Sequence, residues 1–208
     1  MISCARSEEP VAQFREFLTE IDARWKPVGA EPITLQVIGS AALMLQADYD
    51  RGTKDGDVLE SRDGPAAIKE QLLALAGKKT KLHDQFRIYL DVVQRAILFL
   101  PQGPVFYPVE GLALKNFRVE VLDIVDVAVS KLKRYNGDDA NDIRAMADRD
   151  LLDHARLVER FKGAADRFSI DARALDVPRY LKNLHKVERD IFGVTPSDIE
   201  LPPECLTD

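Results

Sequence analysis

Two aspartates one residue apart, Asp55 and Asp57, are the residues of this chain whose type and spacing point most directly to chemistry. On a β-strand, residues i and i+2 face the same side, so the two carboxylates would lie side by side. Such like charges repel unless they share a cation or a proton. Mg²⁺ takes oxygen ligands and fills its other positions with water and substrate phosphates. The pair therefore predicts half of a phosphoryl-transfer site, with an exposed acidic turn as the alternative.

A second candidate feature is the turn at Gly39 and Ser40, where a short apolar run, ITLQVIG, meets the helix-forming SAALMLQA. Free N–H groups at a helix N-terminus attract phosphate, and glycine lets a phosphate approach the backbone. Ser40 would cap the helix or donate its hydroxyl to a phosphate oxygen. An ordinary strand-to-helix turn is the alternative. Arg51 and Thr53 precede the aspartate pair, where they would shape the turn or contact phosphate.

The elements that must position these residues follow from periodicity. Apolar residues at helical spacing predict a helix over 11–25, and Pro65 and Gly77 bracket a second helix. Strands are predicted at ITLQVIG, DVLES, RIYLDVV, AILFL and FRVEVLD, with a loop from Pro101 to Pro108. A glycine weakens strand character between the two aspartates, at Gly56. From residue 124 the pattern is helical, so we expect a mixed α/β core over 1–123 and a helical part over 124–208.

With its turn, helix and paired aspartates, the chain resembles the nucleotidyltransferase superfamily of DNA polymerase β type. The resemblance implies a mixed sheet flanked by helices, with phosphate held at Gly39 and Ser40 and metal held at Asp55 and Asp57. A third carboxylate is expected on a later strand, and the family order favours Asp91 over the alternative, Glu120. The implied mechanism has two Mg²⁺ ions, bridged by carboxylates, that clamp the attacking and leaving oxygens.

A narrower resemblance, to AbiEii-like nucleotidyltransferases of type IV toxin–antitoxin systems, spans Val37 to Met146. The matching residues are Arg51, Thr53, Asp55, Asp57, Ser130, Lys131, Leu132, Asp139, Asp142 and Ile143. The resemblance implies that Lys131 steadies the triphosphate and that Arg134, one turn later, shares its face. Asp142 would orient Lys131 or accept a proton from the attacking hydroxyl. The alternative is a helix with a local salt bridge.

Composition sets the outer limits. The hydrophobic and charged fractions, 46% and 31%, are those of a globular protein, and no apolar run approaches the ~20 residues that cross a membrane. The N-terminus lacks the apolar segment of a secretory signal, so the cytoplasm is expected. The net charge of −6 disfavours a general nucleic-acid binder. A local basic patch remains open at Gly77–Arg87, with a solvated loop as the alternative.

Together these features predict a Mg²⁺-dependent enzyme that moves a nucleoside monophosphate from an NTP to a hydroxyl. The resemblance suggests an RNA end, such as that of tRNA, or a protein as acceptor, within a toxin–antitoxin pair that includes a cognate antitoxin. Two rival hypotheses remain: a nucleotide- or partner-binding module without turnover, and a purely structural partner of a neighbouring gene product.

Overall fold

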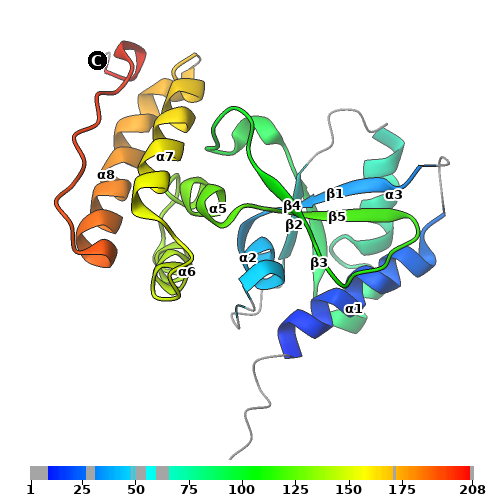
Figure 1. The fold of residues 1–208 in the computed structure, drawn as a ribbon. Coiled ribbons are helices and arrows are strands. Elements are labelled where there is room, and N and C mark those ends of the chain that lie inside the picture. The colour runs from blue at the N-terminus through cyan, green and yellow to red at the C-terminus, as the bar shows by residue number, and fades with distance from the viewer. Residues whose placement is uncertain are drawn as a thin grey trace, which may run out of the picture. The chain divides into compact units, whose positions relative to one another are not determined.

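The structure is a computed structural model that describes residues 9–26, 31–47, 49, 55–59, 66–170 and 172–206 (Figure 1). The chain forms two compact units. The first unit lies within residues 1–97 and 106–122, and the second within 98–105 and 123–208. The chain thus enters the second unit briefly, returns to the first, and leaves it again after Leu122. The predicted division into domains of residues 1–123 and 124–208 stays a prediction.

A five-stranded mixed sheet forms the centre of the first unit, in the order β3-β2-β1-β5-β4. The strands are β1 (Ile33–Val37), β2 (Asp55–Leu59), β3 (Tyr89–Val93), β4 (Phe106–Pro108) and β5 (Phe117–Leu122). β1 runs parallel to β5, and β2 runs parallel to β3, whereas β1 with β2 and β4 with β5 are antiparallel. This sheet with its flanking helices confirms the predicted fold class.

Among its described residues, the first unit contains the helices α1 (Glu9–Arg24), α2 (Gly39–Ala47), α3 (Ala66–Ala76) and α4 (Lys81–Phe86). The apolar stripe of α1 is buried against the sheet and α4, because Phe14, Phe17 and Ile21 are fully excluded from solvent. The rings of Phe17 and Phe86 lie 5.7 Å apart. Trp25, just after α1, meets Phe117 of β5 edge to face at 5.0 Å. The predicted first helix is therefore a core element.

The second unit is helical, as the sequence predicts. Its elements are α5 (Ile124–Lys131), α6 (Gly137–Ala147), α7 (His154–Phe168), η2 (Ala172–Asp176), α8 (Val177–Val187), η3 (Glu188–Phe192) and η4 (Pro203–Cys205). The buried carboxylate of Glu188 accepts hydrogen bonds from the Ser197 backbone and hydroxyl, and it pairs with His154 at 3.0 Å. These contacts hold the C-terminal segment to the helices of this unit.

The predicted strand AILFL is wrong. Arg95–Ile97 forms a short 3₁₀ turn, η1, and the following residues leave the sheet. Phe99 is instead fully buried in the second unit, where its ring lies 4.9–5.3 Å from those of Phe161, Phe168 and Tyr180. Arg167 donates to the carbonyls of Leu98 and Leu100. Aromatic burial against α7 and α8 thus outweighs the β propensity of this run.

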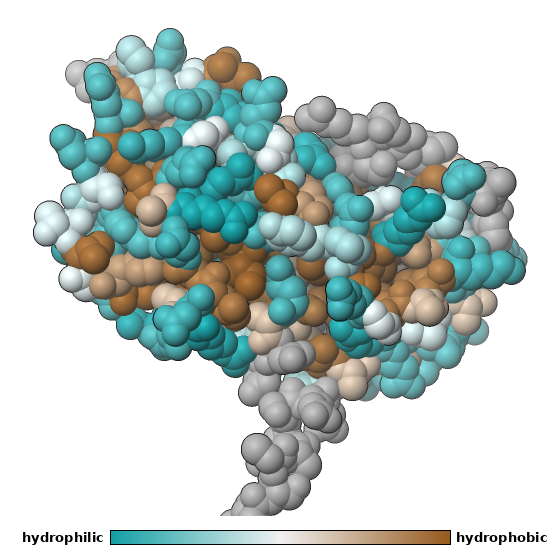
Figure 2. Space-filling model, in the orientation of Figure 1, coloured by the Kyte–Doolittle hydropathy of each residue, from teal (hydrophilic) through white to brown (hydrophobic). Residues whose placement is uncertain are grey.

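Two loop predictions also differ from the structure. The predicted loop Pro101–Pro108 ends in strand β4, and Gly77–Arg87 contains helix α4, which Thr80 caps by accepting from the His83 N–H. Of the helices in the described ranges, none combines the length and the apolarity needed to cross a bilayer. On the face drawn in Figure 2, hydrophilic residues are interspersed with hydrophobic ones.

Candidate active site

Asp57 and Asp91 lie directly opposite each other on neighbouring strands. β2 and β3 pair in parallel, with Asp57 in register with Asp91 and Asp55 in register with Tyr89. Side chains in register share a face of the sheet. Like charges placed opposite each other destabilise a sheet, so the arrangement costs free energy in the absence of a cation. The first candidate pair and the favoured third carboxylate therefore occupy one face of two adjacent strands.

The face that carries these aspartates is polar across four strands, and the opposite face is the core. The strand registers place the following side chains on the polar face: Thr34, Gln36, Asp55, Asp57, Asp91, Arg118 and Glu120. On the other face, Val37, Val58 and Leu90 are almost completely buried. This alternation is the pattern of a sheet with one covered and one open face.

Tyr89 is part of this cluster, although sequence reasoning did not single it out. Its hydroxyl is hydrogen-bonded to Asp55. That hydrogen bond, partial burial, and the negative charges of Asp55, Asp91 and Asp57 raise the pKa of Tyr89 to about 12. The hydroxyl is therefore within electrostatic reach of all three carboxylates. A signal for Tyr89 was available in the alternation of RIYLDVV, which puts Tyr89 and Asp91 on the same face.

Gly39 connects the predicted phosphate turn to the aspartates. It has a φ of +62° at the first position of α2, a conformation that glycine adopts without strain. A Cβ at this position would lie 3.3 Å from Oδ2 of Asp57, so the backbone of the turn passes close to that carboxylate. The Ile38 N–H also donates to the Asp57 carbonyl at 2.9 Å. Gly39 and Ser40 thus begin a helix beside the carboxylate pair.

The glycine between the aspartates does not interrupt the strand. β2 runs without a break from Asp55 to Leu59, and Gly56 is buried on the core face. A Cβ at Gly56 would lie 2.9 Å from Leu90 Cδ2 and 3.0 Å from the ring of Phe14. Leu90 and the Phe14 ring therefore fill the space beside Gly56 on the core face. The strand thus forms in spite of Gly56, and a weaker strand at this position stays a prediction.

Glu120, the alternative third carboxylate, lies farther from Asp57. β1 separates β5 from β2, so the two side chains are about two strand spacings, ~10 Å, apart. Glu120 accepts a hydrogen bond from Gln36 Nε2 at 3.1 Å, and Gln36 Oε1 accepts one from Arg95 at 3.0 Å. The register therefore favours Asp91 as the partner of Asp57. Glu120 instead ends a chain of two hydrogen bonds that runs from Arg95 through Gln36.

The structure does not show an assembled metal cage. Throughout the described ranges, no three His, Cys, Asp or Glu side chains are grouped closely enough to hold a metal ion. The assignment of Asp55, Asp57 and Asp91 as metal ligands stays a prediction. Thr53 and Arg51 lie outside the described residues.

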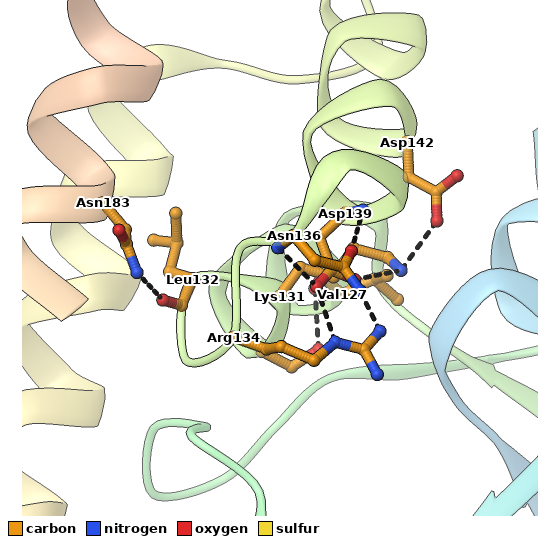
Figure 3. A network of polar contacts seen from close by, with 9 residues as sticks. Val127, Lys131, Leu132, Arg134, Asn136, Asp139, Asp142 and Asn183 are labelled. Atoms are coloured by element: carbon orange, nitrogen blue, oxygen red, sulfur yellow. Dashed lines mark hydrogen bonds and ion pairs between the residues drawn. The ribbon is translucent and has the colours of Figure 1, made fainter. Parts of the chain in front are cut away.

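Lys131 and Asp142, predicted from the second resemblance, form a buried ion pair within the second unit (Figure 3). Lys131 Nζ lies 2.7 Å from Asp142 Oδ2 and 3.3 Å from Asp139 Oδ1. The side chains of Lys131, Asp139 and Asp142 are 8%, 2% and 0% exposed. Asp142 does contact Lys131 as an orienting partner would, and the pair joins α5 to α6. A contact of Lys131 with a triphosphate stays a prediction.

Arg134 completes this network from the surface, with 70% of its side chain exposed. Its Nε and Nη2 donate to the two oxygens of Asp139 at 2.9 and 3.0 Å. Burial alone would raise the pKa of Asp139, but Arg134, the charge of Lys131 and the Asn136 N–H together hold that pKa below its usual value. Asn136 and Asp139 also form a reciprocal cap at the start of α6. Sequence reasoning predicted these positions but not this closed network.

A family model described as "Nucleotidyltransferase of unknown function (DUF6036)" matches residues 16–180, which is most of the chain. The chain belongs to this nucleotidyltransferase family. The match includes both the aspartate face of the first unit and the Lys131 network of the second. No curated protein and no solved structure was found to match the chain.

Membership places this nucleotidyltransferase in the superfamily expected from Gly39, Ser40 and the aspartate pair. It supports nucleotidyl transfer, with an NTP as substrate, as the general activity. The narrower resemblance to AbiEii-like proteins is not confirmed by this match. The metal, the acceptor and the biological role stay predictions.

Proposed function

We propose that this protein catalyses Mg²⁺-dependent transfer of a nucleoside monophosphate from an NTP to a hydroxyl group of an RNA end or a protein. The in-register placement of Asp57 opposite Asp91 carries the proposal. Such a like-charge pair costs stability unless it serves to bind a cation. The approach of Gly39 to Asp57 adds a helix N-terminus next to the carboxylates, where phosphate oxygens are favoured.

The carboxylate face fits a magnesium ion chemically. All three candidate ligands offer oxygen, and Mg²⁺ is usually held by one or two carboxylates together with substrate phosphates. Asp57 and Asp91 would be the central ligands, and Asp55 would join them from the next position on the same face. When bound, the metal would neutralise charge on the phosphates and on the attacking oxygen.

The chemical step replaces a phosphoanhydride bond of the NTP with a phosphoester bond to the acceptor. The acceptor hydroxyl oxygen attacks the α-phosphorus of the NTP, and a new O–P bond forms. The bond between the α-phosphorus and the bridging oxygen to the β-phosphate breaks, and pyrophosphate leaves with that oxygen. The hydroxyl proton passes to a carboxylate of the aspartate face or to solvent. Gly39 and Ser40 would hold the phosphates through the α2 N-terminus. The roles of Lys131 and Arg134 toward the triphosphate stay predictions from the AbiEii-like resemblance.

A toxin role within a toxin–antitoxin pair, with tRNA as one acceptor, belongs to the same proposal. It rests on the order of the residues that the AbiEii-like group shares with this chain, from Arg51 to Ile143. A cognate antitoxin would then be its partner.

Incubation of the protein with labelled NTPs, Mg²⁺ and either total RNA or cell lysate tests the activity. We expect label on an acceptor, with a loss of about a hundredfold or more in Asp57→Asn and Asp91→Asn. Glu120→Gln is the matched control, since it removes a carboxylate from the same face two strands away. Activity in Asp57→Asn equal to that of the wild type would refute the proposal.

Calorimetry with Mg²⁺ and a non-hydrolysable NTP analogue separates the rival hypotheses. Binding together with transfer supports the enzyme. Tight binding without any transfer product would instead identify a nucleotide-binding module. Loss of activity in Glu120→Gln but not in Asp91→Asn would identify Glu120 on β5, and not Asp91, as the third metal ligand.

A further inference from the structure

The segment Gly77–Arg87 concentrates positive charge in an acidic protein. It holds four cationic side chains and one carboxylate, Asp84, for a net charge of +3, while the whole chain carries −6. The four cationic side chains are all exposed: Lys78, Lys79, Lys81 and Arg87. We call these four residues the α4 cationic surface. Its charge is of the kind that binds phosphate backbones.

The backbone beneath the α4 cationic surface is fixed at both ends of the helix. Lys79 and Arg87 have φ values of +66° and +58°, a region that costs residues with a Cβ free energy. Thr80 caps α4 by accepting from the His83 N–H at 3.2 Å, and the Lys79 N–H donates to His83 Nδ1 at 3.0 Å. Glycine would occupy either positive-φ position at lower cost. This chain nevertheless has cationic residues at both positions.

The α4 cationic surface borders the aspartate face. Lys78 Nζ lies 5.1 Å from the ring centre of Tyr89, and His83 meets the same ring edge-on at 5.2 Å. The Tyr89 hydroxyl interacts with Asp55 through a hydrogen bond, and the negative charges of Asp91 and Asp57 also act on it. Lys78 thus lies over the ring of the tyrosine whose hydroxyl interacts with the carboxylates. A polyanion approaching those carboxylates is repelled by them, and neighbouring cations offset that repulsion.

We propose that the α4 cationic surface binds the phosphate backbone of an RNA acceptor and delivers its hydroxyl to the aspartate face. The inference rests on the proposed function and identifies its acceptor class. Protein partners are usually held by large apolar anchors. Among the described residues, the exposed large hydrophobic side chains all lie outside Gly77–Arg87. Charge without apolar anchors favours a nucleic-acid backbone over a protein surface.

The test measures RNA binding without catalysis. The probe is fluorescein-labelled bulk tRNA, followed by anisotropy in the presence of EDTA and without NTP. We expect Lys78→Gln/Lys79→Gln/Lys81→Gln to bind at least about tenfold more weakly than the wild type. The slope of log affinity against log salt concentration should become shallower by about 2 to 3 units, as three lost phosphate contacts require. Circular dichroism and melting temperature verify that the variant is folded.

A matched control lies on α8 and η3, where Lys182, Lys186 and Arg189 are also exposed at helical spacing. Lys182→Gln/Lys186→Gln/Arg189→Gln removes the same charge and should bind tRNA as the wild type does. Equal losses in both triple variants, or a loss only in the control, would overturn the proposal. Competition by polyglutamate as strong as that by unlabelled tRNA at equal charge would overturn the assignment to RNA.

The same variants separate this inference from the proposed function. RNA labelling that persists unchanged in the α4 triple variant, while Asp57→Asn is inactive, refutes the RNA surface and leaves the enzyme intact. Absence of transfer by the wild type to any acceptor refutes the proposed function, whatever the anisotropy shows. Loss of both tRNA binding and RNA labelling in the α4 triple variant supports the inference. Retained binding of the Mg²⁺-NTP analogue by that variant shows that the nucleotide site is undamaged.

Discussion

At the scale of single residues, the aspartate face depends on a glycine that contributes no side chain. Gly56 separates the two aspartates on β2 and faces the core, where the Phe14 ring occupies the space beside it. The strand therefore holds the two carboxylates on its open face because α1 packs closely against its other face. A residue of the first helix supports a site whose charged groups come from β2 and β3.

Replacement of Gly56 by alanine tests this packing. The added Cβ would meet Leu90 at 2.9 Å and Phe14 at 3.0 Å, so we expect a loss of about 1–3 kcal/mol in the free energy of unfolding. Urea denaturation of Gly56→Ala measures the loss, and Phe14→Leu in the same chain should recover part of it. Gly137→Ala is the control, since nothing lies within 4 Å of its Cβ position. Equal stability of Gly56→Ala and wild type would show that the contact is not restrictive.

The candidate site was predictable to the extent that it follows strand alternation. The spacing of Asp55 and Asp57, and the position of Asp91 in RIYLDVV, fix which face each carboxylate occupies once the strands are known. The pairing of β2 with β3 could not be predicted from either segment alone, because it depends on how the chain crosses the sheet. The packing of Phe14 against Gly56 was unpredictable for the same reason, since it joins residues far apart in sequence.

At the scale of elements, the junction of α5 and α6 is built on buried charge. Lys131 on α5 is balanced by Asp139 and Asp142 on α6, and Arg134 adds a second cation from the surface. A buried ion pair adds little net stability compared with apolar packing. Removal of one partner is nevertheless strongly destabilising, because it leaves the other charge buried without compensation. The junction therefore fixes the two helices relative to each other more than it stabilises them.

Lys131→Met should cost about 3–5 kcal/mol of unfolding free energy, because Asp142 loses its ammonium partner in a buried position. Lys131→Met/Asp142→Leu should recover most of that loss, since Asp139 keeps its hydrogen bonds from Arg134 and Asn136. Urea denaturation measures both variants. The transfer assay on the stable double variant then tests the predicted phosphate role of Lys131: full activity would exclude it.

Acid should weaken the same junction. The pKa of Asp139 is lowered in the folded state, so its contribution to stability is present above the unfolded pKa, near 4, and is lost as the pH falls toward the folded value. We expect the melting temperature of the wild type to fall more steeply below about pH 5 than that of Asp139→Asn. Asp138→Asn, which removes a neighbouring exposed carboxylate, should retain the wild-type slope. Parallel curves for all three proteins would contradict the lowered pKa.

At the scale of the whole molecule, the second unit is discontinuous in sequence. Its core includes Phe99, which is followed by the irregular residues 100–105 and then by the strands β4 and β5 of the first unit. Asp126, fully buried, accepts from the Val105 N–H at 2.9 Å and is held by Arg160 through both carboxylate oxygens. The sequence showed a helical C-terminal part but not this insertion, because AILFL has the composition of a strand.

A chain of residues 123–206 alone should therefore fail to fold. Joining residues 98–105 to it through a short Gly-Ser linker should restore folding, since the Asp123 N–H donates to the Val105 carbonyl at 2.9 Å and these ends are adjacent. Near-ultraviolet circular dichroism and cooperative melting distinguish the two chains. Phe99→Ala in the linked chain should cost about 3–5 kcal/mol. Cooperative folding of 123–206 without the added segment would refute the requirement.

The early position of Phe99 has a consequence for synthesis on the ribosome. Residues 98–105 are synthesised well before α7 and α8. The Phe99 ring therefore has no contact with Phe161, Phe168 or Tyr180 until those residues have been synthesised. At typical translation rates that interval lasts roughly 4–16 s. During it, the nascent chain exposes an apolar segment that chaperones can bind. Maturation of the second unit thus awaits the translation of α8.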